Sequence, residues 1–460
     1  MQHQPLLKIT FIQGLQEVVL SEISTCTPLK GKIFLIERND DSLFFNLGSG
    51  LADSTQDADT YGSDTYIESD FESEISAEIY VGLLSLKSVV NVFLVQRGEK
   101  LHPLHINNHK SILGDMIETV LLLEKSRAEK NSAESSVKKK STPKAKSAFK
   151  TFKLRCAGSD SPEVQSIQRY ISETFKLQAI DEFSRASTNA TTDTETSGPN
   201  SGSNTGVDLD MYIHKPDALW EVGVRLTPRP LSVRDYKIEH IKGGINPTVA
   251  YAMNTFAFSH MFSQTKITPL QLDFSYLNIC SGSATLLIEA YFQMVRLQSA
   301  EAFAGVSGHF LGFDIDKKTN SQAIHNIQNA GLIRDIQIKT ADLLDKPDFA
   351  DKGRKEDEKG EVRGSAKFAT FDIITSDLPF GMQIGKGDDL DKLYKTFVEY
   401  TTEKLKENGV LVVYTTEADT FGKALRGSAF TIDKTVSLKL TTSVGSIIQP
   451  KIFVCNKKAN

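Results

Sequence analysis

The sequence predicts an α/β protein whose C-terminal half carries a mostly parallel, seven-stranded, Rossmann-like sheet. Strand-like and helix-like segments alternate between Tyr276 and Thr415, and a turn of small residues follows the first of these strands. Acidic side chains follow the later strands. This alternation is typical of a parallel sheet with helices on both faces.

The strands of this half are expected at 276–280, 310–314, 336–339, 371–375 and 410–415, with helices at 285–298, 318–330 and 390–407. Two more strand-like segments, 434–440 and 451–456, are expected to add a hairpin at the sheet edge.

Shorter elements fill the first half, which is predicted to be α+β. A helix-like segment at 15–23 accompanies strand-like segments at 32–36 and 91–95. A further strand at 152–156 precedes Ser161-Pro162-Glu163, a combination that caps a helix and opens its first turn. The segments 207–213 and 220–226 alternate at period two, as paired strands do.

Four segments contain too few large apolar residues to repay the entropy of ordering, and we expect them to be insertions or linkers. They are the acidic segment 51–78, the basic run 138–155, the Ser/Thr-rich segment 184–206 and the charged segment 351–363.

Length and composition limit the class of protein. A chain of 460 residues exceeds what one core normally fills, so two or three domains are expected. With no long apolar stretch and no basic-then-apolar N-terminus, the protein is expected in the cytoplasm, with the nucleus as an alternative in a eukaryote. The four cysteines are far apart, which favours reduced thiols over a disulfide framework or a metal site.

The net charge of −5 does not exclude a polyanionic partner. Residues 51–78 carry nine acidic side chains and no Lys or Arg, whereas residues 138–155 carry eight Lys or Arg and no acid. Because the charges are segregated along the chain, net charge alone does not decide between nucleic acid and other partners.

The turn after the first C-terminal strand is the first candidate for a binding site. Ser281-Gly282-Ser283-Ala284-Thr285 leads directly into a helix, a geometry that lets a ligand approach the backbone at a helix N-terminus. With a single glycine, the same segment also suits a tight turn that binds nothing.

Acidic residues after the next two strands are the second candidate. Asp314 stands where a carboxylate can accept hydrogen bonds from ribose hydroxyls, 32 residues after Gly282, which requires a long first crossover. Asp342 stands where a side chain can meet an adenine amino group, although it also reads as an ordinary loop residue. Asp316 is expected only to cap the following helix.

The third candidate is Asp377-Leu378-Pro379-Phe380-Gly381, at the end of the fourth strand. The lone pair of an exocyclic amine is delocalised into its base. An oxygen of Asp377 that accepts one N–H would raise the nucleophilicity of this amine, and a backbone carbonyl can take the other. Phe380 would stack on a base that has left its own stack. A strand followed by a proline turn and a core aromatic is the structural alternative.

These motifs resemble, in the same order, those of the THUMP-domain guanosine-N2 methyltransferases that modify tRNA. Upstream segments extend the resemblance over nearly the whole chain: 10–17 resembles the opening of a ferredoxin-like domain, 152–155 with 207–227 a THUMP domain, and 231–253 the linker and lead-in helix.

The resemblance implies four parts: a ferredoxin-like domain at 1–110 that holds the acidic insert 51–78, a THUMP RNA-binding domain at 111–230, a linker at 231–245, and a class I methyltransferase domain at 246–460 that uses S-adenosylmethionine.

By the same resemblance, Asp377, Leu378, Pro379 and Phe380 grip the target guanine. The cofactor would be held by the residues of the turn, of the following strand ends and of the lead-in helix: Asn278, Ser281, Gly282, Ser283, Thr285, Asp314, Asp342, Pro247 and Thr248.

Two positions depart from the family pattern. Asn278 stands where an acidic residue is usual, and Ala284 stands where a second glycine is usual. The first removes a charge that could face the ammonium of the cofactor, and the second narrows the turn. We expect both to weaken cofactor affinity. Leu378 replaces a commoner proline and is tolerated in the subgroup that ends Leu-Pro-Phe-Gly.

Two groups of residues are candidates for RNA contact. The basic run with Phe149 and Phe152 suits phosphate contact, or else a solvated linker or a nuclear-import signal. The second group, which we favour, lies nearer the expected junction between modules and consists of Arg225, Arg229, Arg234, Tyr236 and Lys237.

The leading hypothesis is S-adenosylmethionine-dependent methylation of guanosine N2 in a structured RNA, with tRNA as the first candidate. One alternative is a non-catalytic RNA-binding scaffold that keeps the methyltransferase fold. Another is the same chemistry on ribosomal or small nuclear RNA, or on an adenine amino group. Some eukaryotic enzymes of this family work with a small zinc-containing activating subunit, and the sequence does not identify a surface for one.

Overall fold

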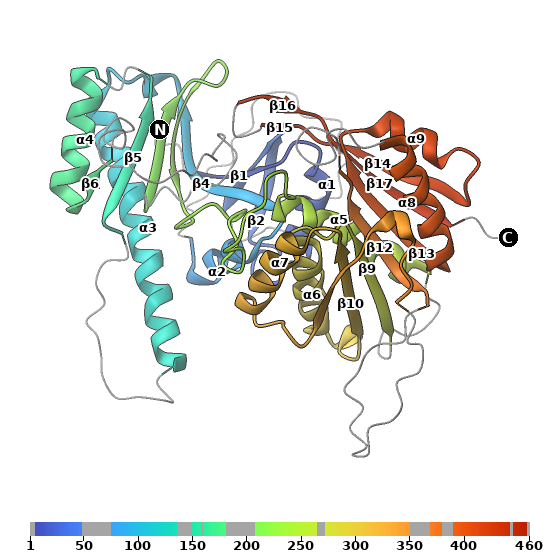
Figure 1. Cartoon of the computed structure of the whole chain (residues 1–460). Helices are drawn as coiled ribbons and strands as arrows, with labels where there is room; N and C mark the ends of the chain where they lie inside the picture. Colours follow the sequence, from blue (N-terminus) through green and yellow to red (C-terminus); the bar gives the residue numbers. More distant parts are fainter. Residues whose placement is uncertain are drawn as a thin grey trace, which may run out of the picture. The chain divides into compact units, whose positions relative to one another are not determined.

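The computed structural model describes residues 5–47, 75–135, 149–157, 160–180, 208–264, 272–349, 369–379, 390–441 and 445–457. The chain forms two compact units (Figure 1). The first comprises Met1–Phe11, Val19–Thr196 and Gly202–Leu231, and the second Ile12–Val18, Ser197–Ser201 and Ser232–Asn460. Within the described ranges, no helix is both long enough and apolar enough to cross a membrane.

An eight-stranded sheet organises the first unit, in the order β2-β3-β1-β4-β8-β7-β5-β6. Its strands are β1 (Leu6–Phe11), β2 (Ile33–Arg38), β3 (Ser42–Leu47), β4 (Val89–Gly98), β5 (Thr151–Cys156), β6 (Gln178–Ala179), β7 (Leu209–His214) and β8 (Trp220–Arg225). The expected pairing of the last two is confirmed, because β7 and β8 are antiparallel. Since β4 pairs with β8, strands from both predicted N-terminal domains share one sheet.

The helices of the first unit were predicted from the sequence only in part. They are α1 (Gln16–Thr25), α2 (Ala77–Ser85), α3 (Ile106–Ser135) and α4 (Pro162–Phe175), with a short 3-10 turn η1 (Glu99–Leu101). Ser161 caps α4 as expected, since its hydroxyl accepts the N–H of Val164. The long helix α3 was not predicted, although its buried residues Leu113, Ile117 and Val120 recur at helical spacing.

The second unit contains the predicted seven-stranded sheet, in the order β11-β10-β9-β12-β13-β17-β14. Its strands are β9 (Asp273–Ile279), β10 (Ser307–Asp314), β11 (Ile336–Thr340), β12 (Phe371–Asp377), β13 (Leu405–Thr415), β14 (Phe430–Ser437) and β17 (Lys451–Lys457). The first five are parallel. The expected hairpin is also present, with β17 placed antiparallel between β13 and β14. The sheet is therefore mostly parallel, as predicted.

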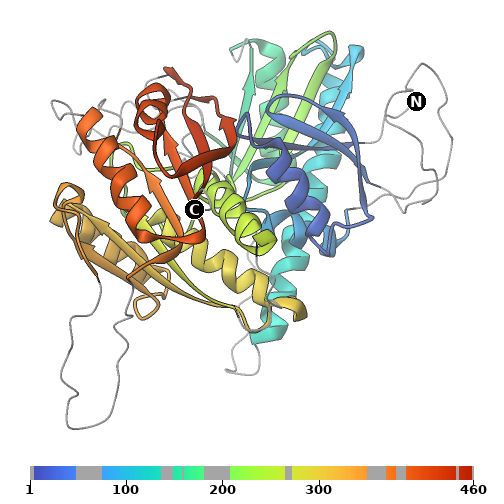
Figure 2. The ribbon, with the colours of Figure 1, turned by 90° about the vertical axis from the view of Figure 1, so that its right-hand side faces the viewer.

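Helices cover both faces of this sheet (Figure 2). They are α5 (Pro247–Gln264), α6 (Thr285–Gln298), α7 (Lys317–Asn329), α8 (Leu390–Lys404) and α9 (Ala418–Leu425). The unit also contains four short elements: η4 (Glu301–Phe303), η5 (Leu343–Asp345), β15 (Leu440–Thr441) and β16 (Ile447–Ile448). Helix α5 packs on α6, and α8 packs on α9. The core between the sheet and the second pair contains Phe397 and Phe421, both fully buried.

A chain of buried hydrogen bonds ties α5 to the middle of the sheet. Asn254 of α5 donates to the carbonyl of Leu286 (3.0 Å) and accepts from the Tyr276 hydroxyl (2.6 Å). Thr375 donates to the Tyr276 oxygen (2.9 Å), and the amide nitrogen of Asn278 donates to the Thr375 hydroxyl (3.2 Å). Every link donates in the same direction, so the orientation of each side chain is fixed.

We predict that Tyr276→Phe lowers the free energy of unfolding by about 1–3 kcal/mol. The change leaves the Asn254 oxygen without its donor and the Thr375 hydroxyl without its acceptor, in a region from which water is excluded. Chemical denaturation of the full chain measures the effect. An unchanged midpoint would show that this chain of hydrogen bonds does not stabilise the unit.

Candidate active site at the carboxyl edge of the parallel sheet

Strands β10, β9 and β12 are neighbours and parallel, so their carboxyl ends meet at one edge of the sheet. Cys280 lies at the end of β9, and burial and the nearby carboxylates of Asp314, Asp377 and Asp342 all raise the pKa of its thiol well above its usual range. The three aspartates predicted for the site therefore all lie near enough to act on this thiol. This edge of the sheet gathers acidic side chains.

The turn from β9 into α6 holds three residues in the left-handed region: Cys280 (φ 54°), Gly282 (φ 52°) and Ala284 (φ 63°). Only glycine adopts this conformation without cost, so two side-chain-bearing residues store strain here. Backbone strain of this kind gathers at functional sites. At Ala284, where the resemblance implies a second glycine, the positive φ is one that glycine would adopt without strain.

The N-terminus of α6 has no side-chain cap, in contrast to α7, where Asp316 accepts the N–H groups of Lys318 and Thr319 as predicted. The leading N–H groups of α6 therefore face the turn rather than a capping oxygen. Ser283 and Thr285 hydrogen-bond to each other through their hydroxyls (3.1 Å). Uncapped N–H groups at a helix N-terminus favour an anionic or strongly polar ligand.

Asp314 joins the turn to the end of β10. Its carboxylate accepts the N–H of Gly282 (3.1 Å) and the N–H of Asp316 (3.1 Å). Burial raises the pKa of Asp314, and these backbone donors oppose the rise. A carboxylate fixed in this way retains lone pairs for further donors, such as the two hydroxyls of a ribose.

Asp342 follows β11 and caps the short turn η5, because its Oδ1 accepts the N–H of Leu344 (2.9 Å). Among the described residues, no hydrogen bond to its other carboxylate oxygen is seen. The proposed contact with an adenine amino group stays a prediction, and the structure adds that the side chain is held in a fixed orientation.

The lead-in helix α5 begins at the same edge. The side chain of Asn246 accepts the N–H of Thr248 (2.8 Å), and Pro247 takes the first helical position, where a missing N–H costs nothing. Thr248 is fully buried, and its hydroxyl has no hydrogen-bond partner among the described residues.

The Asp377 motif is held rigidly as far as the structure describes it. Leu378 is fully buried in the core and donates its N–H to the Tyr414 carbonyl (3.0 Å), so only its backbone can face a ligand. The carbonyl of Pro379 accepts the Tyr394 hydroxyl (3.0 Å). Phe380 and Gly381 lie outside the described residues.

Asp377 itself is oriented by backbone. One carboxylate oxygen accepts the N–H of Ile245, while Oδ1 is buried and has no hydrogen-bond partner in the described part of the chain. Burial raises the pKa of this carboxyl to about 8, and the charge of Lys237 opposes the rise. A buried acceptor that lacks a donor is typical of a group that binds a ligand.

Asn278 was expected only to remove a charge from the site, but its amide also has a structural role. Its amide nitrogen donates to the carbonyl (3.1 Å) and to the hydroxyl (3.2 Å) of Thr375, and its Oδ1 is buried without a partner among the described residues. An aspartate would set an oxygen against the Thr375 carbonyl. The amide is therefore matched to this sheet, and it still offers one oxygen to a cationic or N–H-bearing ligand.

Together these features define a methyltransferase domain that uses S-adenosylmethionine. This cofactor carries a positive sulfonium and an ammonium group. The edge offers three acidic side chains, together with oxygens of Asn278, Ser281, Thr248 and Asp377 that are buried and have no partner within the described ranges. The residues therefore fit the group in charge and in hydrogen-bonding capacity.

Comparisons with known proteins agree. Residues 234–443 match the UPF0020 family model, described as "RMKL-like, methyltransferase domain". Curated relatives are the mouse and bovine proteins named "U6 snRNA (guanine-N(2))-methyltransferase THUMPD2", 26% and 25% identical over 210 and 211 residues, 46% of this chain. The chain spans about a third of the length of these relatives, 31% and 32%.

Solved structures with a similar fold include TrmN from Thermus thermophilus, with a TM-score of 0.58 and 16% identity over 99% of this chain and all of the other. Another is a possible methylase from Clostridium difficile 630, with a TM-score of 0.54 and 16% identity over 99% of both chains. At these identities the likeness concerns the fold. It confirms the predicted α/β methyltransferase fold.

The residues predicted to bind RNA make intramolecular contacts instead of lying free at the surface. Arg225 (5% exposed) bonds to the carbonyls of Thr227 and Pro228, and Arg234 (8% exposed) pairs with Glu289. Tyr236 is also buried, Lys237 bonds to Ile245, and Arg229 is the exposed member of the group. Their predicted contact with RNA is untested, and the buried members have a structural role.

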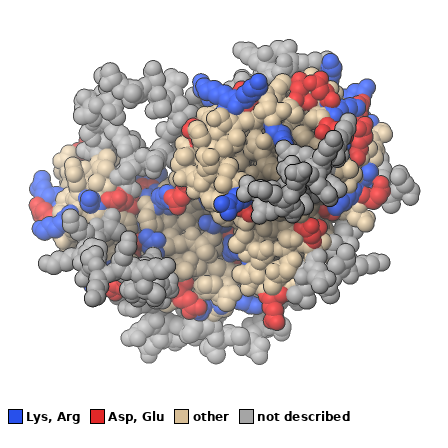
Figure 3. Space-filling model, turned by 60° about the horizontal axis from the view of Figure 1, so that its bottom comes forward, with Lys and Arg blue, Asp and Glu red and all other residues tan. Residues whose placement is uncertain are grey.

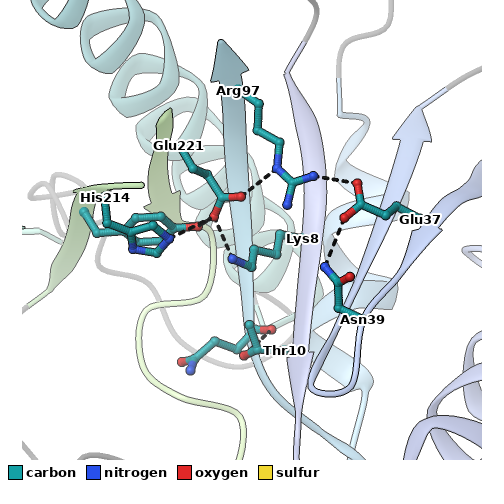
Figure 4. Close-up of polar contacts among 9 residues, drawn as sticks. Lys8, Thr10, Glu37, Asn39, Arg97, His214 and Glu221 are labelled. Atoms are coloured by element: carbon teal, nitrogen blue, oxygen red, sulfur yellow. Dashed lines mark hydrogen bonds and ion pairs between the residues drawn. The ribbon is translucent and has the colours of Figure 1, made fainter. Parts of the chain in front are cut away.

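Cations on the strands of the first unit are also paired, as Figure 4 shows. Glu221 is fully buried and contacts Lys8 (2.6 Å) and Arg97 (2.8 Å), and Arg97 also pairs with Glu37 (2.5 Å). His214 lies 3.5 Å from the same carboxylate. This cluster is close to neutral, so it stabilises the sheet rather than forming a field for phosphates.

Figure 3 extends this observation to one face of the molecule, where Lys or Arg and Asp or Glu are interspersed among the described residues.

Sequence reasoning missed several residues that build the site. Glu289 of α6 is buried and receives the Arg234 guanidinium (2.8 Å) and the Tyr236 hydroxyl (2.7 Å). Asn326 of α7 donates to the carbonyls of Glu239 (3.1 Å) and Ser283 (3.2 Å). An acid or amide inside an otherwise apolar helix face was the available signal, since such groups are buried only with partners.

We predict that Asp314→Asn weakens S-adenosylmethionine binding roughly 10- to 100-fold, because hydrogen bonds to a charged acceptor contribute about 1.5–3 kcal/mol. Isothermal calorimetry on the full chain measures the dissociation constant. Asp345→Asn, an exposed carboxylate on η5, is the control and should bind normally. Equal affinities for all three proteins would remove Asp314 from the cofactor site.

We predict that Ala284→Gly raises the free energy of unfolding by about 1 kcal/mol, because glycine adopts a φ of 63° without the penalty that a methyl group brings. Thermal and chemical unfolding provide the measurement. A loss of stability would mean that the Ala284 methyl contributes more by packing than its conformation costs.

Proposed function

We propose that this protein methylates N2 of a guanosine in a structured RNA, with S-adenosylmethionine as the methyl donor. The observation that carries the proposal is the Asp377 carboxylate at the sheet edge, near the strained turn of Gly282 and the carboxylate of Asp314. One of its oxygens is buried and has no hydrogen-bond partner among the residues that the structure describes. The names of the curated relatives, which specify guanine-N2 methylation of U6 snRNA, support the same acceptor atom.

The residues of the site have two roles: some hold the cofactor, and Asp377 acts on the target amine. Asp314 and Asp342 orient the adenosine part of the cofactor, and Asn278, Ser281 and Thr248 offer oxygens to its methionine part. S-adenosylmethionine supplies an electrophilic methyl group bonded to a sulfonium. Asp377 accepts an N–H of the exocyclic amine, which makes the nitrogen lone pair more available, and the backbone after it offers a second acceptor. Correct positioning supplies most of the acceleration.

The first unit would hold the RNA. We propose that residues 1–110 form the ferredoxin-like part and residues 111–230 the THUMP part, and that they bind the RNA by shape and phosphates while one base leaves its stack. tRNA is the first candidate substrate, by the resemblance of the motifs. U6 snRNA is the second, by the names of the curated relatives. We place this activity in the cytoplasm if the substrate is tRNA.

A non-catalytic scaffold is less consistent with the site. Asn278 motivated that alternative, and the structure shows an amide that satisfies the neighbouring strand and leaves one oxygen available. The left-handed conformation of Ala284 destabilises the fold, but its methyl group does not cap the N-terminus of α6. The N–H groups there are left for a ligand.

We predict that the purified protein forms N2-methylguanosine on RNA from a strain that lacks the gene, and that Asp377→Asn lowers kcat by at least about 100-fold. Nucleoside mass spectrometry identifies the product. Asp391→Asn, an exposed carboxylate on α8, is the control and should keep wild-type activity. Methylation of adenosine alone would change the acceptor, and no methylated nucleoside with any RNA would overturn the proposal.

A further inference from the structure

The Asp377 carboxylate is connected to a second charged group through the backbone of one residue, Ile245. Lys237 donates from Nζ to the carbonyl of Ile245 (2.9 Å), and the N–H of the same Ile245 bonds to Asp377. Ile245 is buried and directly precedes the cap of α5. A single residue therefore receives the ammonium on one side and orients the carboxylate on the other.

The segment that carries Lys237 is fixed to the helices around the site. Arg234 and Tyr236 both bond to Glu289 of α6. Glu239 exchanges backbone hydrogen bonds with the Asn326 side chain of α7, as donor at 2.8 Å and acceptor at 3.1 Å. With anchors on both sides of it, the Lys237 ammonium has a fixed position relative to Asp377.

Other titratable groups face Asp377 from the neighbouring elements. They are Cys280 at the end of β9, Tyr394 on α8 and Tyr414 on β13, and the carboxylate of Asp377 raises the pKa of all three. Because burial raises these pKa values as well, all three are neutral at physiological pH. Lys237, which in turn faces Glu289 and Arg234, is the cation that acts on Asp377.

We propose that Lys237 is a positioning residue that favours the ionised form of the Asp377 carboxylate and keeps it correctly oriented, and so sets the pH range in which the exocyclic amine can be activated. The inference rests on the proposed function, since it concerns the acceptor form of Asp377. Only the ionised carboxylate can accept the N–H of the amine and then take its proton. That proton would be released as the N–C bond forms and the S–CH3 bond breaks, with S-adenosylhomocysteine leaving as a neutral thioether. Lys237 acts within the domain, in contrast to its predicted role toward RNA.

The direction of the effect follows from the charges. Burial raises the pKa of Asp377 to about 8 even with Lys237 present, and burial lowers the pKa of Lys237 to about 8. Removal of the ammonium removes the opposing influence on Asp377, so its pKa rises further. An opposite charge within a few ångströms typically changes a carboxyl pKa by about one to three units.

The test compares Lys237→Met with wild type, using the pH dependence of kcat/KM for the full chain at saturating cofactor. Activity rises with pH as Asp377 ionises, and we expect the midpoint of this rise to move up by about one pH unit or more in Lys237→Met. The rate at pH 7 should fall about tenfold for each unit, and recover at high pH. Lys237→Arg restores the charge and should return the midpoint toward the wild-type value.

Lys242→Met, an exposed lysine in the same segment, is the matched control and should leave the profile unchanged. A pH-independent loss of activity in Lys237→Met would overturn the proposal, because it would show a purely structural role.

A second readout does not need turnover. The carbon-13 resonance of the Asp377 carboxyl, identified by its absence in Asp377→Asn, should titrate at higher pH in Lys237→Met than in wild type. An unchanged titration overturns the role of Lys237. An inactive wild type that still shows the displaced titration would leave the role of Lys237 standing and would count against the proposed function instead.

Discussion

The parallel register of β10, β9 and β12 is the constraint on which the site depends. Gly312 pairs with Asn278, and Asn278 pairs with Thr375, so the residues that follow each strand emerge at the same level. Asp314, Cys280 and Asp377 therefore come together at this edge, although they are far apart in the sequence. A slip of one residue in either pairing would turn a carboxylate away from the edge.

Polar contacts beneath that edge hold the register. The directed chain from Asn254 through Tyr276 and Thr375 reaches Asn278, and Asn320 of α7 bonds both to the carbonyl of Asp314 (3.0 Å) and to the Thr340 hydroxyl (3.0 Å). Buried hydrogen bonds of this kind cost more when broken than they contribute when formed. The same groups that specify the sheet therefore also fix the strands whose ends carry the site.

Sequence reasoning located this half of the molecule well because its signals are local. Alternation of strands and helices, the capping role of Asp316 and the strand that delivers Asp377 each depend on a few adjacent residues. It did not reveal that Asn278 donates hydrogen bonds to Thr375, or that Lys237 and Asp377 both bond to the backbone of Ile245. These contacts bring together residues that lie 97 positions apart (Asn278 and Thr375) and more than 100 positions apart (Lys237 and Asp377). The pairing of β4 with β8 in the first unit escaped for the same reason.

The account is tested most directly by a crystal structure of the full chain with S-adenosylhomocysteine. We predict that the ribose lies on Asp314 and that the sulfur lies beside the free oxygen of Asp377, with the turn at Gly282 in contact with the ligand. A ligand bound elsewhere, or an Asp377 carboxylate turned away from the sulfur, would contradict the claim that one sheet edge brings donor and acceptor together.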